Sequence, residues 1–264
     1  MTEEELRAAV YTSFIEEAAN RIIEKLAKIQ KRALVVCTGS ALAFPEWMYS
    51  LKELKLNGFE FDLFLSYGAV QALDTQKIEN EVDFGEVWYG ESDKLPEHLV
   101  SPYYTVIVPS LTISSASKLA SCIADTPSTR MIMTAMMQGK NVIIATNGCC
   151  PDNIRRIAKG YCLTGPLKET LRKNITLIRS FGATLTTAKA LSHKVLSVIG
   201  GNQDTGQREE CDISGTIYFD KRILTRQDLT AVPRGAKITL AEKCQITQLA
   251  SDIARERGVD IVRK

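Results

Sequence analysis

The stretch from Val106 to Asn147 constrains the fold of this chain more than any other. It contains a short apolar run ending at Pro109, a cluster of hydroxyl residues, a helical segment and a second apolar run that ends in Thr-Asn. This order indicates a strand, a polar loop, a helix and a second strand. In an open parallel sheet, ligands bind at the loops that leave the carboxyl ends of the strands. We therefore expect a ligand site in the polar loop 110–115.

Two earlier apolar runs end in the same way. Residues 33–37 lead into the Thr-Gly-Ser segment 38–40, and residues 61–65 lead into Ser66. Such continuous apolar runs are typical of strands that are buried on both faces of a parallel sheet. Together with the two strands of the central stretch they alternate with helical patterns, which predicts an α/β fold with a doubly wound parallel sheet.

The chain divides into three expected parts. An N-terminal helix occupies 1–31, a Rossmann-like domain 32–200 and a small α+β tail 201–264, which begins at a polar, glycine-containing break. The tail is small for an independent core, so we expect it to pack on the main domain or on a partner.

Other elements are less regular. Apolar residues recur every four positions in the N-terminal helix, which spreads its apolar surface around much of the helix. Such a helix packs on its own domain, contacts another subunit or is recognised by a partner, and all three remain open. We expect the acidic segment 79–102 to be an irregular surface excursion and 116–137 to be a single helix. Further helices are expected at 154–161 and 167–180.

The composition excludes several functional classes. The net charge is +2, with 33 basic and 31 acidic residues, so nothing indicates nucleic acid or an anionic membrane as a partner. No apolar stretch approaches the roughly 20 residues that span a bilayer, and the acidic N-terminus differs from a signal peptide. The seven scattered cysteines indicate reduced thiols in the cytoplasm. With two histidines and no CxxC pair, we expect no metal site.

The three polar strand ends share one chemistry. Helix N-termini present unpaired amides and a partial positive charge, so a dianionic phosphate fits there. Hydroxyl groups add donors, and glycine lets the backbone approach closely. Taken alone, each loop is better explained as a helix N-cap, but the three together favour one site for a mononucleotide phosphate. The sequence has neither GxGxxG nor GxxxxGK[ST], which argues against dinucleotide and triphosphate sites.

The segment PSLTISSASKLASCIADTPSTRMIMTAM, which begins at Pro109, resembles the third nucleotide-contacting block of the homo-oligomeric flavin-containing cysteine decarboxylase family. With one inserted residue, the family pattern is matched by Pro109, Thr112, Ser115, Lys118, Ala120 and Asp125. The segment 38–40, the hydroxyl of Ser66 and the Ala-Thr-Asn ending 145–147 match the other blocks in order. The resemblance implies a flavodoxin-like Rossmann sheet that binds FMN in a homo-oligomer, a trimer or a dodecamer, with the flavin at a subunit boundary.

The resemblance also implies which residues contact the flavin. They are Thr38, Gly39, Ser40, Ser66, Ser110, Thr112, Ser114, Ser115, Lys118, Thr146 and Asn147.

The chain departs from the decarboxylase pattern at catalytic positions. Ser114 stands where the family has an asparagine that helps to bind the substrate carboxylate. His98 is the only candidate for the catalytic histidine, but it lies too close to Pro109. It is better explained as a histidine of a surface loop. Cys150 and Cys162 are candidates for the acid on a mobile flap, although neither has the expected neighbours. Decarboxylation of a cysteinyl substrate is therefore the weaker expectation.

The tail has a resemblance of its own. Its Thr-x-x-Asp-Leu turn at 225–229 and the segment ITQLASDIARERGVDIV at 246–262 are similar to the ends of proteins associated with bacterial microcompartments. This implies a flavoprotein that works with, or inside, such a compartment, with a shell protein or a redox protein as partner. An ordinary closing unit of helix, glycine and strand explains the same residues.

The sequence thus favours an FMN-binding redox or electron-transfer protein, with a role like that of a flavin reductase. Two alternatives remain. One is an FMN-dependent decarboxylase that uses His98, and the other is a structural or adaptor protein without the cofactor.

Overall fold

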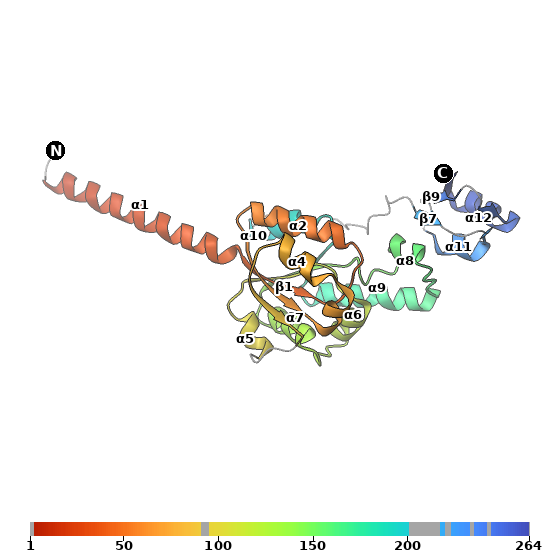
Figure 1. Cartoon of the computed structure of the whole chain (residues 1–264). Helices are drawn as coiled ribbons and strands as arrows, with labels where there is room; N and C mark the ends of the chain where they lie inside the picture. Colours follow the sequence, from red (N-terminus) through yellow and green to blue (C-terminus); the bar gives the residue numbers. More distant parts are fainter. Residues whose placement is uncertain are drawn as a thin grey trace.

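A six-stranded parallel sheet forms the centre of the molecule (Figure 1). The computed structural model describes residues 3–90, 95–200, 217–219, 223–232, 235–241 and 244–263. The strands of the sheet are β1 (Arg32–Cys37), β2 (Glu60–Leu65), β3 (Phe84–Tyr89), β4 (Thr105–Val108), β5 (Asn141–Ala145) and β6 (Thr184–Thr186). Their order is β3-β2-β1-β4-β5-β6. The predicted flavodoxin-like, doubly wound class is confirmed, with the strand order of the Rossmann variant.

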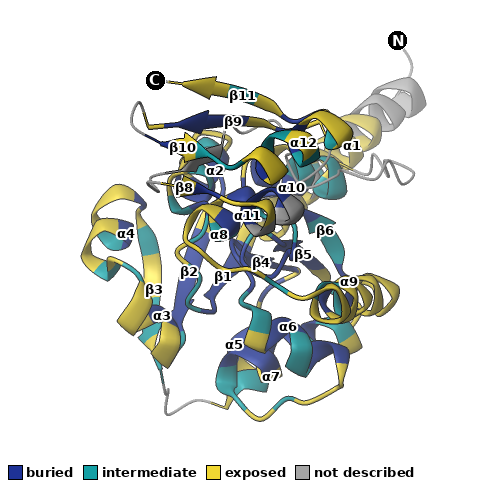
Figure 2. Cartoon of the chain, turned by 90° about the vertical axis from the view of Figure 1, so that its right-hand side faces the viewer, coloured by how far each residue is buried: buried dark blue, intermediate teal, exposed yellow. Residues whose placement is uncertain are grey.

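Helices cover both faces of this sheet, which gives three layers (Figure 2). One face packs on α2 (Phe44–Leu56) and α10 (Leu191–Ile199), near the short α3 (Tyr67–Ala72) and α4 (Thr75–Glu81). The other face packs on α5 (Pro96–Val100), α6 (Ile113–Ala120), α7 (Pro127–Met137) and α9 (Gly165–Ser180). Alternate residues of each central strand enter the two cores, Val35 the first and Leu34 the second, and both are fully buried. Two-sided burial explains the continuous apolar runs of the sequence.

The segment 79–102 was wrongly predicted to be irregular, because it contains the edge strand β3 and the helix α5. The strand depends on a carboxylate of the neighbouring strand: the Glu86 amide donates to Asp62 Oδ1 at 2.6 Å. Burial alone would raise the pKa of Asp62, but bonds from the Tyr103 hydroxyl, this amide and Arg32 together hold it below its usual value. An edge strand held by a tertiary contact leaves little trace in its own sequence.

The single helix predicted at 116–137 is in fact two helices. The first, α6, ends in a Schellman-type turn, in which the Ile123 amide donates to the Lys118 carbonyl and Cys122 has a left-handed φ of 56°. The second, α7, begins after Thr126 with a capping box and has Pro127 in its first turn. The break was missed because a cysteine occupies the left-handed position that glycine usually takes.

The C-terminal tail forms a small unit with its own core. It contains β7 (Ile217–Phe219), β8 (Ile223–Leu224), α11 (Arg226–Ala231), β9 (Lys237–Leu240), β10 (Gln245–Ile246), α12 (Gln248–Arg257) and β11 (Asp260–Arg263). The core of this unit includes Ile154 and Ile157 of α8 (Ile154–Ala158), so the tail packs on a helix that follows β5 of the main sheet. The polar break predicted after residue 200 lies outside the described residues.

The N-terminal helix α1 (Glu3–Gln30) extends away from the sheet (Figure 1). It runs into β1 after a single residue, Lys31. Among the described residues, no helix is long and apolar enough to cross a membrane.

Candidate functional site

A cavity of about 360 Å³ opens where the strand order reverses, between the ends of β1 and β4. This is the place where open α/β sheets bind ligands, and its volume is within the range of small-molecule sites. Its described lining consists of Gly39, Ser40, Leu42, Thr112, Ile113, Ser114, Gly148, Arg156, Lys159 and Tyr161. These residues come from the loops after β1, β4 and β5 and from α8 with the segment that follows it.

Hydrogen bonds from one buried hydroxyl hold the first two loops together. Thr38 Oγ1 donates to the Ser110 carbonyl and accepts the Thr112 amide, each at 3.1 Å. Ser110 Oγ in turn donates to the Leu42 carbonyl at 3.1 Å. The loops after β1 and β4 therefore form one rigid rim, although they are more than 70 residues apart in the chain.

Glycine is required where the other loops meet this rim. A Cβ on Gly148 would lie 2.3 Å from the Leu111 carbonyl oxygen and 2.4 Å from Ser40 Oγ. Gly39 has a φ of +95°, and its Cβ would lie 2.6 Å from the Gly68 carbonyl group. The loops after β1, β2, β4 and β5 are thus in close contact. For the first three, this proximity was predicted from their shared polar character.

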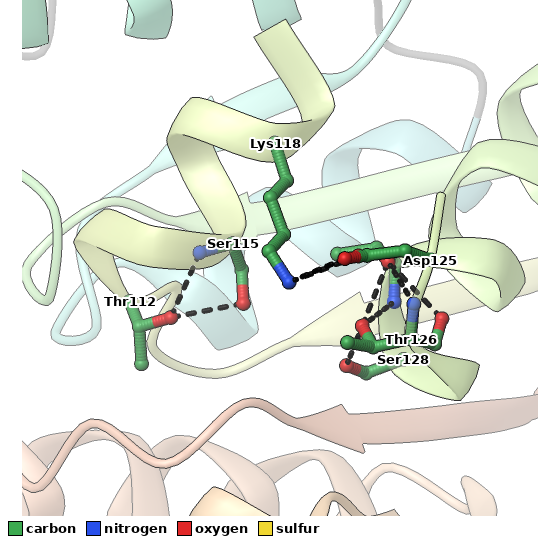
Figure 3. Close-up of polar contacts among 7 residues, drawn as sticks. Thr112, Ser115, Lys118, Asp125, Thr126 and Ser128 are labelled. Carbon is green, nitrogen blue, oxygen red and sulfur yellow. Dashed lines mark hydrogen bonds and ion pairs between the residues drawn. The ribbon is translucent and has the colours of Figure 1, made fainter. Parts of the chain in front are cut away.

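The start of α6 faces the cavity. Thr112 caps the helix, because its Oγ1 accepts the Ser115 amide at 3.2 Å and donates to Ser115 Oγ at 2.9 Å (Figure 3). The first amides of a helix have no acceptor within the helix, and both Ile113 and Ser114, the first two residues of α6, line the cavity. This end of the cavity therefore favours an anion.

Two basic residues also line the cavity, and they were not predicted. Arg156 Nη2 donates to the Gly148 carbonyl oxygen, which fixes the guanidinium against the loop after β5. Its Nε is buried and has no hydrogen-bond partner among the described residues. Lys159 and the exposed ring of Tyr161 belong to the same lining. The described lining residues include two basic side chains and no acidic one.

This arrangement fits a phosphate group. A buried donor without an acceptor costs about 1–3 kcal/mol, and a phosphate oxygen would remove that cost at Arg156 Nε. The same anion would meet the first-turn amides of α6 and the hydroxyl groups of Ser40 and Ser114. The basic residues follow the strand end at β5 as the sequence NIRRIAKGY, and this cluster was the available signal. The motifs of the flavoprotein pattern end at residues 145–147 and do not include this cluster.

The structure brings four of the predicted contact residues to the cavity: Gly39, Ser40, Thr112 and Ser114. The other seven are Thr38, Ser66, Ser110, Ser115, Lys118, Thr146 and Asn147, which are not among the lining residues. The hydroxyl groups of Thr38, Ser110 and Ser115 instead form the hydrogen bonds described above, within and between the loops after β1 and β4.

The remaining four predicted residues have contacts of their own. Ser66 accepts the Ala69 amide and caps α3. Lys118 Nζ bonds both carboxylate oxygens of Asp125, at 2.9 and 3.0 Å (Figure 3). Thr146 Oγ1 donates to the Thr186 carbonyl at 3.4 Å, and Asn147 Oδ1 accepts the Ala188 amide at 2.6 Å. The contacts of Thr146 and Asn147 connect the loop after β5 to residues 186–188.

The candidate acid–base residues lie elsewhere. His98 is exposed on α5, which precedes β4, whereas the cavity lies beyond the carboxyl end of that strand. Cys150 is buried and Cys162 is exposed, and neither is a lining residue. Burial raises the pKa of the Cys37 thiol, at the end of β1, to about 12. Among the described residues, no three His, Cys, Asp or Glu side chains gather as metal ligands do.

Comparison with known proteins finds similarity at the level of the fold. No protein-family model matches the chain, and no curated protein matches it. DmrB of Burkholderia xenovorans, described as a cubic protein cage for redox transfer, is 21% identical. The alignment covers 64% of this chain and 97% of DmrB, with a TM-score of 0.49. DmrB has also been solved in complex with FMN.

Two decarboxylase structures align over similar lengths. A dodecameric FMN-dependent UbiX-like decarboxylase from Escherichia coli O157:H7 is 14% identical, over 68% of this chain and 100% of its own, with a TM-score of 0.48. TvaF, an FMN-dependent cysteine decarboxylase from thioviridamide biosynthesis, is 20% identical, over 64% and 98%, with a TM-score of 0.47. All three similarities are below 25% identity, so they show a distant likeness in fold and assign no ligand or reaction to this chain.

Proposed function

We propose that the chain binds FMN, with the phosphate in the cavity between the start of α6 and Arg156. The observation that carries the proposal is Arg156, a residue of the cavity lining whose buried Nε has no hydrogen-bond partner among the described residues, beside helix-start residues and hydroxyl groups of the same lining. A phosphate supplies acceptors to all of these donors at once.

The position of the cavity favours a mononucleotide over a free phosphate ion. The cavity of about 360 Å³ is larger than an inorganic anion needs, and it lies at the switch point of a Rossmann-type sheet. Tyr161, with 60% of its surface exposed, offers an aromatic face at the same site.

We further propose that the bound flavin serves in electron transfer. A flavin accepts two electrons from a reduced carrier and passes them on singly, while the protein positions and tunes it. The described lining residues include no histidine, carboxylate or cysteine. This composition suits a site that binds and tunes a cofactor better than one that moves protons on a substrate, so we do not favour the decarboxylase alternative. Association with a bacterial microcompartment stays a prediction from the resemblance of the tail.

The visible spectrum of the purified chain, before and after incubation with FMN, tests the proposal. We expect flavin absorption and uptake of FMN, with riboflavin bound more weakly because it lacks the phosphate. Ser114→Asp should expel FMN by charge repulsion, whereas Ser121→Asp, at the far end of α6, should not. No FMN uptake by the folded wild-type chain would refute the proposal.

A further inference from the structure

The N-terminal helix carries a narrow apolar stripe along its length. Steps of about 100° per residue place six of its apolar residues within about 40° of one line, whereas the exposed Phe14 lies about 80° from that line. The stripe consists of Tyr11, Ile15, Ala18, Ile22, Leu26 and Ile29, spaced three or four residues apart. This is the spacing of a helix-pairing seam. The seam is one line within the broad apolar surface predicted for this helix, which also includes Phe14.

The stripe is open to solvent in the single chain. Tyr11 is 68% exposed, Ile15 64%, Ile22 58%, and even Ile29, beside the domain, is 45% exposed. The helix has 28 residues and is therefore about 42 Å long. In proteins, most of the stability of a helix comes from packing of its apolar face. A helix with such an exposed apolar stripe therefore needs a packing partner that covers the stripe.

The chain's own domain does not provide that cover. Only Lys31 separates α1 from the buried strand β1. This residue is fixed, because its carbonyl accepts the Glu60 amide and its Nζ donates to the Asn57 carbonyl, both at 3.0 Å. No flexible linker would let the helix fold back, and Figure 1 shows it pointing away from the sheet. The cover must therefore come from another molecule.

Charge and side-chain size point to the same helix in a second copy. Residues 11–20 contain Glu16 and Glu17 and no basic residue, whereas residues 21–30 are net basic and include Arg21 and Lys25. An antiparallel pair places each acidic half beside a basic half, whereas a parallel pair places like beside like. The acidic half also makes an anionic lipid surface a poor partner.

The seam fits the antiparallel arrangement in detail. When the pair is centred on residue 20, Tyr11 lies level with Ile29, and Ala18 lies level with Ile22. Ile15 lies close to Leu26. The small Ala18 therefore faces the larger Ile22 at the centre of the pair, where the two helices can approach closely. We propose that α1 is a dimerisation arm that pairs antiparallel with α1 of a second copy and holds two domains at opposite ends of the pair.

The test is the molar mass of the full chain in solution, measured by sedimentation over a range of concentrations. Ile15→Glu with Ile22→Glu places charge on the seam, and we expect it to halve the assembly formed by the wild type. Ser13→Glu with Asn20→Glu makes the same charge change on the opposite, exposed side of the helix and should leave the mass unchanged. Equal masses for the two double variants would overturn the proposal.

Charge exchange tests the orientation. Glu16→Lys with Glu17→Lys, and separately Arg21→Glu with Lys25→Glu, should each weaken the association about tenfold, or about 1.4 kcal/mol. Combining all four substitutions should restore it, because opposite charges face each other again. If either double variant associates as tightly as the wild type, or if the combined variant stays dissociated, the antiparallel pair is wrong.

Discussion

Replacement of Arg156 by methionine should weaken FMN much more than it weakens riboflavin. The side chain lines the cavity, and its buried Nε has no partner in the described part of the chain. A hydrogen bond to a charged group contributes about 1.5–3 kcal/mol. Since each 1.4 kcal/mol is a factor of ten in affinity, we expect the Kd for FMN to rise by about 10- to 150-fold.

Riboflavin separates the phosphate contact from general damage. It has the same ring system and sugar chain but no phosphate, so its Kd should change less than threefold on the same substitution. Methionine also removes the bond from Arg156 to the Gly148 carbonyl, and any resulting loop movement would affect both ligands alike. The ratio of the two Kd values therefore reports the phosphate contact.

The neighbouring Arg155 provides a matched control. It pairs with Glu46 outside the cavity lining, so Arg155→Met makes the same charge change without touching the site. Fluorescence titration of all three proteins with both flavins gives the needed constants. If Arg156→Met weakens FMN and riboflavin equally, or no more than Arg155→Met does, the phosphate does not lie beside Arg156.

Three further predictions concern the scaffold. Gly148→Ala should lower the unfolding free energy by more than about 2 kcal/mol and abolish FMN uptake, because a Cβ at this position has no room. In the control Gly165→Ala, the added Cβ lies in open space, so thermal unfolding should be unchanged or occur at a slightly higher temperature. Asp62→Asn should lower the unfolding free energy by about 2–4 kcal/mol at neutral pH. The folded-state pKa of Asp62 is lowered, so the wild type should lose this extra stability as the pH falls below about 3.9. The measurement is the difference in unfolding free energy between the wild type and Asp62→Asn, from denaturant titrations at several pH values. A difference that stays constant down to the acid transition would refute the role of the carboxylate. Ile157→Ala should lower the unfolding free energy of the C-terminal unit by about 2–5 kcal/mol and, because Ile157 belongs to α8, raise the Kd for FMN. Unchanged FMN binding together with faster hydrogen exchange in the tail would show that the tail does not support the site.

The central sheet could be predicted because its strands are buried on both faces. Residues such as Leu34 and Val35 must both be apolar when each enters a different core, so the pattern is visible in the sequence alone. The edge strand β3 could not be found in this way. It is exposed on one side and depends on Asp62 of another strand, a contact that no local pattern encodes.

The cavity was predicted in position but only partly in composition. Polar residues at strand ends located the loops correctly, and Gly39 and Ser40 line the cavity as expected. Thr38 and Ser110 have the same side-chain chemistry, but their hydroxyl groups bond the neighbouring loops. Sequence alone does not distinguish a hydroxyl that faces a ligand from one that faces a carbonyl. Arg156 was missed because its role depends on how α8 folds back over the loop after β5.

The structure of the full chain crystallised with FMN tests the central claim most directly. We predict one flavin for each chain, with its phosphate hydrogen-bonded to Arg156 Nε and to the first-turn amides of α6. A flavin whose phosphate lies away from Arg156, or a cavity that stays empty at saturating FMN, would contradict the account.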